Sequence, residues 1–315
     1  MDKVSRLAGV LVCAAMVASA GCSTTNSAVT PVTGSPTNMQ APAAAQTGSG
    51  WIHAGGVVYH TPHYMAIRGK QQPAAQPALQ LTYGGGPVLA KAKMYLIFWD
   101  FKGSGDPNHL KKLLKLYANN VGGSGYNNIY TQYTGPSGNI TNPAKQFGGA
   151  WSDNTHKIPS SPSDAQVAAE AVNGMTHFGF DPNGSYVVVT AHNHNSPGFG
   201  SQFCAYHSDT STPKGTISYT NLPYIPDAGQ NCGSGIIGAP QDETSADEGV
   251  TIVEGHEYGE SVTDPQPFSG WNSSQGEIGD ICAWIDIQND PFGSKSFTAQ
   301  PMYSNASSSC VHSYP

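Results

Sequence analysis

Apolar and polar positions along the chain alternate in blocks that predict strands and helices from about residue 81 onward. Residues 88–99 alternate in part and end in the continuous apolar run 95–99, which predicts a central strand. Asn108 can cap a helix over 109–119, and its apolar side chains share one face. The apolar residues on this face are Leu110, Leu113, Leu114 and Tyr117.

The middle of the chain continues this alternation of elements. Residues 126–133 are typical of a strand, and Ser163 with Gln166 forms a capping box that opens a helix to about Met175. Residues 186–190 are apolar throughout, which predicts a strand buried on both faces. We expect loops over 192–245, with one strand at 216–219.

A second capping box, Ser245 with Glu248, opens a helix that runs to about Thr263. Pro265 ends it, because the residue before a proline disfavours the α conformation. The remainder, 266–315, is rich in turns. This order predicts an α/β (α+β) fold over 81–315, a loop-rich, zincin-like mixed sheet with a backing helix and an active-site helix.

The N-terminus has the features of an export signal. Lys3 and Arg6 precede the apolar stretch 7–18, which is too short to span a bilayer and leads to small residues before Gly21. Residues 1–21 are therefore expected to be removed. Because the sequence before Cys22 is close to a bacterial lipobox, we expect either lipidation of Cys22 or plain secretion. The protein would be an outer-membrane lipoprotein, periplasmic or extracellular.

Two low-complexity stretches separate the leader from the predicted domain. Residues 22–50 consist mainly of small and polar residues, and they predict a disordered tether. Residues 51–80 contain a segment that is either a hairpin or a pro-region, followed by a linker rich in Gln, Pro and Ala. We expect the histidines of this segment to have no catalytic part. They are His53, His60 and His63.

Charge and cysteine content limit which partners and which cellular compartment the protein can have. Charged residues make up 11% of the chain and the net charge is −7, so no basic stripe is present and nucleic acid is not an expected partner. Membrane contact is expected only through a lipid anchor, and we expect a monomer. An even number of mature cysteines in an oxidising compartment predicts two disulfides. Three pairings are open, and loop length favours Cys204–Cys232 with Cys282–Cys310.

The helix over 248–263 contains the pattern that carries chemistry. His256 and Glu260 are four residues apart and project from one face of a helix, where they can bind one ion. Glu257 corresponds to the general base of HExxH hydrolases, with a carboxylate in place of the second histidine ligand. A catalytic Zn²⁺ with three protein ligands would keep one position open for water.

The third ligand must come from outside this helix. Glu277 is the first candidate, and Asp280 is the second, as a ligand or as the carboxylate that orients His256. Asp264 is a further candidate. His207 is an extra ligand or a hydrogen-bond donor to the transition state, or else a loop histidine held near a disulfide.

The same residues also have a simpler interpretation. A His-Glu pair on a helix can be a structural polar cluster without a metal. Gly255 and Gly259 favour a site, because glycine inside a helix costs roughly 1 kcal/mol relative to alanine and so suggests close approach of another group.

Several of these motifs are similar to the EXORDIUM (phosphate-induced protein) family. The matching segments, in the same order as in that family, are 83–89 (YGGGPVL), 94–99 (MYLIFW), 185–190 (SYVVVT), 203–207 (FCAYH), 256–265 (HEYGESVTDP) with Gly270 and Trp271, and 277–282 (EIGDIC). The plant pattern reads HEIAE-x-x-TNP and later EIADLC, so Asp264 stands where that pattern has Asn. The resemblance covers about 82–285 and implies a secreted protein, without implying an activity.

Two functions follow as hypotheses. The first is a secreted or lipid-anchored zinc-dependent hydrolase, most simply a peptidase, with a peptide or protein as substrate. The second is a non-catalytic binding protein of the cell envelope that binds a wall polymer or a partner. In that case Tyr219, Tyr224 and Trp271 would form an exposed aromatic platform.

Overall fold

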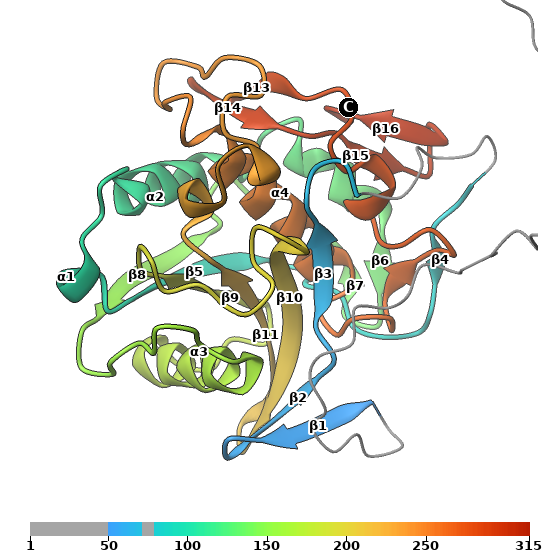
Figure 1. Ribbon diagram of the computed structural model, residues 1–315. Coiled ribbons are helices and arrows are strands. Elements are labelled where there is room, and N and C mark those ends of the chain that lie inside the picture. Colours follow the sequence, from blue (N-terminus) through green and yellow to red (C-terminus); the bar gives the residue numbers. More distant parts are fainter. Residues whose placement is uncertain (1–49, 71–78) are drawn as a thin grey trace, which may run out of the picture. The chain divides into compact units, whose positions relative to one another are not determined.

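A mixed β-sheet of eight strands forms the centre of the protein (Figure 1). The structure, a computed structural model, describes residues 50–70 and 79–315, and these all belong to one compact unit. The predicted leader, the tether, Cys22 and most of the linker lie outside the described residues. The strands of the sheet are β1 (Trp51–Ala54), β2 (Val57–His60), β3 (His63–Ala66), β5 (Lys93–Trp99), β8 (Phe147–Asp153), β9 (Gly184–Thr190), β10 (Phe203–Thr212) and β11 (Gly215–Leu222).

The strand order is β1-β2-β10-β11-β9-β5-β8, with β3 also paired to β10. Strands β8, β5, β9 and β11 are parallel, whereas β10 runs antiparallel to β11. Strands β2 and β3 pair with different parts of β10, with Tyr59 opposite Thr210 and His63 opposite His207. The N-terminal strands are therefore part of the main sheet.

Helices cover both faces of the sheet. Helices α2 and α4 lie on one face and α3 lies on the other (Figure 1). In β5, Ile97 packs against Gly174 of α3, whereas Phe98 faces Lys111 of α2, because successive side chains of a strand point to opposite faces. The helices are α1 (Phe101–Ser104), α2 (Leu110–Asn120), α3 (Asp164–Phe178) and α4 (Glu248–Thr263), with the 3₁₀ helices η1 (Asn127–Gln132), η2 (Ile225–Cys232) and η3 (Asp280–Cys282).

Four small two-stranded sheets complete the described part of the chain. They pair β4 (Thr82–Tyr83) with β12 (Trp271–Asn272), β6 (Thr134–Gly135) with β7 (Gly138–Asn139), β13 (Gln288–Phe292) with β14 (Lys295–Ala299), and β15 (Met302–Ser304) with β16 (Ser309–Val311). The turn-rich C-terminal region thus folds mainly as local hairpins.

The predicted fold class and several elements are confirmed. The protein has an α/β fold with a mixed sheet, and the predicted strands at 95–99, 186–190 and 216–219 lie within β5, β9 and β11. The capping box of Ser163 and Gln166 opens α3. Helix α4 ends at Thr263, as the following proline requires.

Three local predictions are wrong. The N-terminus of α2 is capped by the carboxylate of Asp106, which accepts hydrogen bonds from Leu110 and Lys111, rather than by Asn108. Most of the segment 126–133 forms η1, at Asn127–Gln132, instead of a strand, since burial of its tyrosines follows a helical spacing. The capping box at 245–248 does not form, because Glu248 accepts hydrogen bonds from the N–H groups of Ile237 and Gly238.

The predicted start of the folded domain at residue 81 is also wrong. Strands β1 and β2 form a hairpin, and β3 extends the sheet beside β10, so the fold includes residues 51–66. This agrees with the hairpin alternative for this segment, while its removal as a pro-region stays a prediction. Strands β8 and β10 were not predicted, because their Gly, Ser and Thr residues resemble loops.

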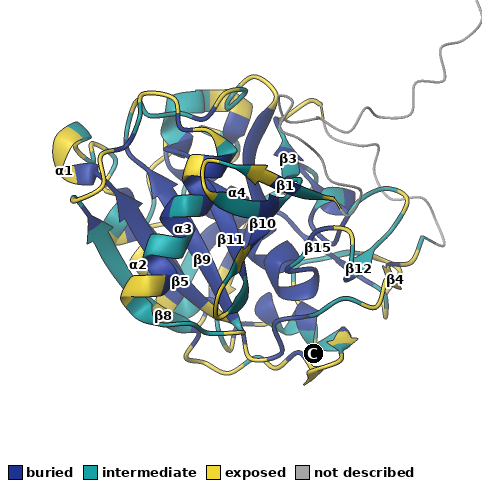
Figure 2. Ribbon diagram, turned by 90° about the horizontal axis from the view of Figure 1, so that it is seen from below, coloured by how far each residue is buried: buried dark blue, intermediate teal, exposed yellow. Residues whose placement is uncertain are grey.

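Helix α4 is buried over its whole length. Figure 2 shows the central strands as buried, whereas α2 and α3 present exposed residues on their outer sides. Gly255 and Gly259 of α4 permit close contact with tyrosine side chains: a Cβ at Gly255 would lie 3.1 Å from the hydroxyl of Tyr117, and one at Gly259 would lie 2.8 Å from that of Tyr130. The close approach inferred from these glycines is therefore made by tyrosine side chains.

The two predicted disulfides are confirmed, with the favoured pairing. Cys204–Cys232 joins the start of β10 to η2, and Cys282–Cys310 joins η3 to β16. Disulfides indicate an oxidising extracellular or periplasmic environment. None of the helices in the described ranges is long and apolar enough to cross a membrane.

Candidate metal centre

Helix α4 contributes three polar side chains to one buried cluster. His256, Glu257 and Glu260 are all fully buried. The Nε2 atom of His256 lies 3.1 Å from Oε1 of Glu260, one helical turn away. The predicted i, i+4 pair therefore faces a common point, as one helical face requires.

The segment just before η3 adds two carboxylates to the cluster. The backbone N–H of Asp280 donates to Oε1 of Glu260 at 3.2 Å, and Oδ1 of Asp280 lies 3.7 Å from Nε2 of His256. Glu277 is buried and its N–H donates to Oδ2 of Asp280. Gly279 allows this approach, because a Cβ there would lie 2.7 Å from Nδ1 of His256.

Strand β10 contributes His207. Its Nε2 atom is 3.1 Å from the backbone carbonyl oxygen of Asp264, which can only accept a hydrogen bond, so Nε2 carries the proton. In the neutral ring, Nδ1 then presents a lone pair. This atom lies 3.4 Å from Oε2 of Glu260 and 3.5 Å from Oε2 of Glu257. A lone pair aimed at two carboxylates requires a cation or a proton between them.

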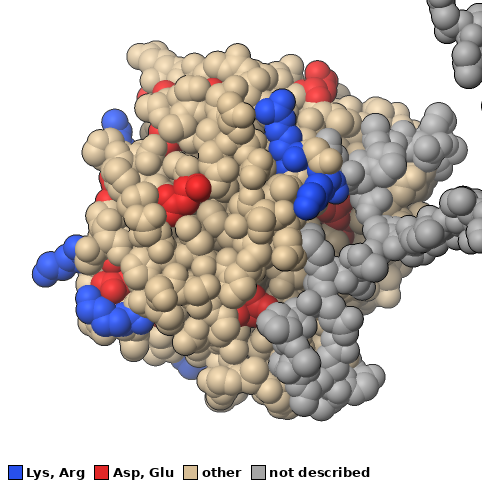
Figure 3. Space-filling model, in the orientation of Figure 1, with Lys and Arg blue, Asp and Glu red and all other residues tan. Residues whose placement is uncertain are grey.

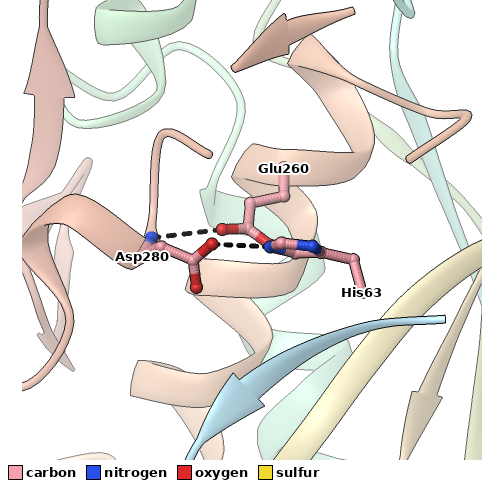
Figure 4. A group of neighbouring side chains, drawn as sticks. All are labelled: His63, Glu260 and Asp280. Atoms are coloured by element: carbon pink, nitrogen blue, oxygen red, sulfur yellow. Dashed lines mark hydrogen bonds and ion pairs between the residues drawn. The ribbon is translucent and has the colours of Figure 1, made fainter. Parts of the chain in front are cut away.

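Strand β3 contributes His63, which the sequence interpretation had set aside. Its Nε2 atom lies 2.5 Å from Oδ2 of Asp280 and 3.9 Å from Oε2 of Glu260 (Figure 4). Its Nδ1 atom lies 3.9 Å from Oε1 of Glu277. The pairing of β3 with β10, which places His63 beside His207, creates this contact.

The cluster shifts the pKa values of its histidines upward. Burial lowers the pKa of His256, but the neighbouring carboxylates, Glu260 first, raise it to about 9. Burial likewise lowers the pKa of His63 and of His207, but the neighbouring carboxylates outweigh this effect. Both pKa values therefore lie well above the ordinary value. The site thus attracts positive charge.

The carboxylates divide into two kinds. Burial would raise the pKa of Glu260, but His256 and His207 lower it well below its ordinary value. Burial raises the pKa of Glu257 and of Glu277. Oε1 of Glu257 and both side-chain oxygens of Glu277 accept no hydrogen bond from the described residues. Unsatisfied buried carboxylate oxygens are costly, and a bound cation would satisfy them.

Two sets of donor atoms are close enough to hold a metal ion, and both include Glu260. One set is His63, Glu260 and Asp280, and the other is His207, Glu257 and Glu260. Imidazole nitrogen with carboxylate oxygen is a donor set that Zn²⁺ accepts. The predicted ligands His256 and Glu260 are adjacent, whereas Glu277 faces His63 and His207 rather than His256.

The cluster has little contact with solvent. The side chains of His63 and Asp280 are 12% and 14% exposed, and the other cluster side chains are essentially inaccessible. Phe268 is half exposed and packs edge-on against His63. Access to the cluster therefore lies on the side formed by β3 and the loop that carries Phe268.

Other predicted site residues have different partners. Oδ1 of Asp264 accepts hydrogen bonds from the N–H groups of Ser269 and Gly270, so this residue holds the loop after α4 and fixes His207 through its carbonyl oxygen. The proposed aromatic platform is wrong, because Tyr219 and Tyr224 are fully buried. Trp271 is half-buried and packs beside Tyr83 and Tyr133.

The other histidines near the sheet have partners outside the cluster or are exposed. His192 contacts the carboxylate of Asp227, and His194 contacts the carbonyl oxygen of Pro159. His60 contacts Asp209 on β10. His53 is exposed.

A third group of potential ligands is located at the end of β8. It consists of Asp153, His156 and Glu170. Oδ1 of Asp153 already accepts hydrogen bonds from Thr155 and from the N–H of His156, and His156 is 55% exposed. This group is therefore partly satisfied within the protein, whereas both side-chain oxygens of Glu277, in the cluster around Glu260, accept no hydrogen bond from the described residues.

Comparison of the chain with family models, characterised proteins and solved structures found no match. The functional interpretation therefore depends on the cluster itself. On the face shown in Figure 3, Lys, Arg, Asp and Glu side chains are scattered over a largely uncharged surface.

Proposed function

We propose that the protein is an exported, metal-dependent hydrolase whose cluster around Glu260 binds a divalent cation, most simply Zn²⁺. The observation that carries this proposal is the convergence of three imidazoles and four carboxylates in a nearly inaccessible position. Without a metal ion the histidines can offset Glu260, but Glu257 and Glu277, whose pKa values burial raises, would have to be protonated or remain unpaired. Polar clusters with strongly perturbed pKa values are typical of functional sites.

The roles of individual residues follow from their positions. His256, Glu260 and Asp280 would bind the ion from one side. Glu277 would bind it from the side where it faces His63 and His207. The ion would supply a water of lowered pKa. Glu257, on the same helix and with its pKa raised by burial, is the residue placed to take a proton from that water.

A peptide or protein is the substrate class that we propose. The pattern His256-Glu257-x-x-Glu260 on a helix beside a mixed sheet supports it, because zinc peptidases use this arrangement with histidine in the last position. The resemblance to the EXORDIUM family supports an extracellular role. Lipidation of Cys22 and anchoring to an outer membrane belong to the same proposal.

Burial of the cluster favours a second candidate function. Because His63 and Asp280 alone among the cluster side chains have measurable exposure, a substrate needs movement of β3 or of the Phe268 loop to reach Glu257. If these elements stay closed, the ion would be structural and the protein would be a non-catalytic envelope protein that binds a wall polymer or a partner.

Metal analysis and a cleavage assay distinguish these functions. Protein purified without added zinc is analysed for bound metal, and casein cleavage is measured with and without a chelator. The hydrolase proposal expects stoichiometric metal and cleavage that the chelator abolishes. Metal that is lost in His256→Ala, with no cleavage by the wild type, would support the structural alternative. Folded protein that binds no metal would contradict both metal roles.

A further inference from the structure

Two carboxylates in the cluster each face at least two different histidines. Asp280 directs Oδ1 toward Nε2 of His256, at 3.7 Å, and Oδ2 toward Nε2 of His63, at 2.5 Å. Glu260 repeats this arrangement, with Oε1 at 3.1 Å from Nε2 of His256 and Oε2 at 3.9 Å from Nε2 of His63. Figure 4 shows Glu260 and His63 meeting Asp280 from separate elements.

This arrangement divides the donor atoms into two sides. The His256 side contains one imidazole nitrogen, Oε1 of Glu260 and Oδ1 of Asp280. The His63 side contains the second oxygen of each carboxylate. Nδ1 of His207 joins the His63 side, because it lies 3.4 Å from Oε2 of Glu260. Each side therefore has at least one imidazole and two carboxylate oxygens.

The number of donors exceeds what one ion uses. Zn²⁺ in proteins is almost always four-coordinate, and a catalytic zinc takes about three protein ligands. Seven side chains converge here: His63, His207, His256, Glu257, Glu260, Glu277 and Asp280. The charge of the cluster also supports more than one ion, because the four carboxylates could offset two divalent cations if all were ionised. In two-metal hydrolytic sites the ions lie about 3.5–4 Å apart, a separation that one carboxylate can span with its two oxygens.

We propose that the cluster is a dinuclear centre for divalent transition metals, with one ion on the His256 side, one on the His63 side, and Glu260 and Asp280 bridging them. This inference rests on the proposed metal-dependent function and specifies its cofactor. It assigns His63 and His207 as ligands of the second ion. It also makes strand β3 a structural part of the metal centre.

Manganese provides a direct test, because Mn²⁺ can be counted and two neighbouring Mn²⁺ ions change each other's paramagnetic resonance spectrum. The purified full-length protein is loaded with Mn²⁺, freed of excess metal and analysed for manganese per chain and for its spectrum. The His156→Ala variant is the matched control, because it removes the ligand group at the end of β8 and leaves the cluster unchanged. Folding of each variant is checked by circular dichroism.

The inference predicts two Mn²⁺ per chain with a spin-coupled spectrum, both in the wild type and in His156→Ala. It predicts one uncoupled ion in His63→Ala. One Mn²⁺ per chain in the wild type, or two with uncoupled spectra, would overturn the dinuclear centre and leave the mononuclear proposal intact. Binding of no Mn²⁺, Zn²⁺ or Co²⁺ would remove both, so the two failures are distinguishable.

Discussion

The Nε2 atom of His63 lies 2.5 Å from Oδ2 of Asp280, although 217 positions separate the two residues. This contact joins the N-terminal strand β3 to the segment at η3, with Glu260 of α4 beside both. Because the contact brings together three distant segments, the metal centre depends on the tertiary fold and not on the α4 motif alone.

The first prediction concerns this contact. His63→Ala is expected to weaken binding of Zn²⁺ by at least about tenfold, since it removes an imidazole from the cluster and leaves Oδ2 of Asp280 without this partner. His53→Ala, on the exposed side of β1, serves as the matched control and should bind as the wild type does. Isothermal titration calorimetry measures both, and equal affinities in the two variants would show that His63 has no part in the centre.

The second prediction separates Glu257 from its neighbour Glu254. Glu257→Gln is expected to retain the metal and lose at least about 100-fold in hydrolytic rate, because glutamine cannot accept the proton. Burial raises the pKa of Glu254 well above its ordinary value and so favours the neutral form, which glutamine resembles; Glu254→Gln should therefore preserve activity. Rates with a casein-derived fluorescent peptide test this, and comparable losses in both variants would argue against a specific role for Glu257.

The third prediction concerns packing behind the centre. Alanine normally stabilises a helix by about 1 kcal/mol relative to glycine. At Gly259 the added Cβ would lie 2.8 Å from the hydroxyl of Tyr130, and such overpacking costs about 1–3 kcal/mol. Gly259→Ala should therefore lower the free energy of unfolding.

Chemical denaturation of a double-mutant cycle checks the cause. Tyr130→Phe removes the hydroxyl but keeps the ring, whose Cζ atom would lie 3.1 Å from the new Cβ. The loss caused by Gly259→Ala should thus be smaller in the Tyr130→Phe background. A loss of the same size in both backgrounds would exclude the hydroxyl contact as its cause.

The sequence predicted the part of the site that is local. His256, Glu257 and Glu260 fall within one turn of a helix, and helical periodicity is sufficient to place them on one face. The pairing of the cysteines was also predicted, because both favoured loops are short. The likeness to HExxH motifs directed attention to Glu277 and Asp280, although it did not show which histidine each would face.

The non-local part of the site could not be predicted in the same way. His63 lies in a short strand whose register with β10 follows from the sheet, and no motif near residue 63 indicates it. His207 belongs to a strand with Ser and Thr at several positions, which in sequence resembles a loop. Nor does the sequence show that Tyr219, which the binding hypothesis places on an exposed platform, is enclosed by the fold.

The fourth prediction concerns pH and the group at the end of β8. Burial raises the pKa of Glu170 to about 8, whereas hydrogen bonds from Thr155 and His156 outweigh burial and lower the pKa of Asp153 to about 2. A raised pKa means that the folded state holds the proton of Glu170 more tightly than the unfolded state. This contribution to stability is complete below about pH 4.5 and is lost as pH rises through about 8.

Glu170→Gln removes this dependence. We expect the wild type to lose a few kcal/mol of unfolding free energy relative to Glu170→Gln between about pH 4.5 and 8. Urea denaturation of both proteins at several pH values provides the comparison. A constant difference across this window would show that Glu170 is ionised in the folded protein.

The most direct test of the metal centre is the anomalous diffraction of crystals grown with zinc, measured on both sides of the zinc absorption edge. The account predicts anomalous density within about 2.0–2.2 Å of Nε2 of His256 and of a Glu260 carboxylate oxygen. A well-ordered cluster without anomalous density, in crystals that contain zinc, would contradict it and leave a protonated structural cluster.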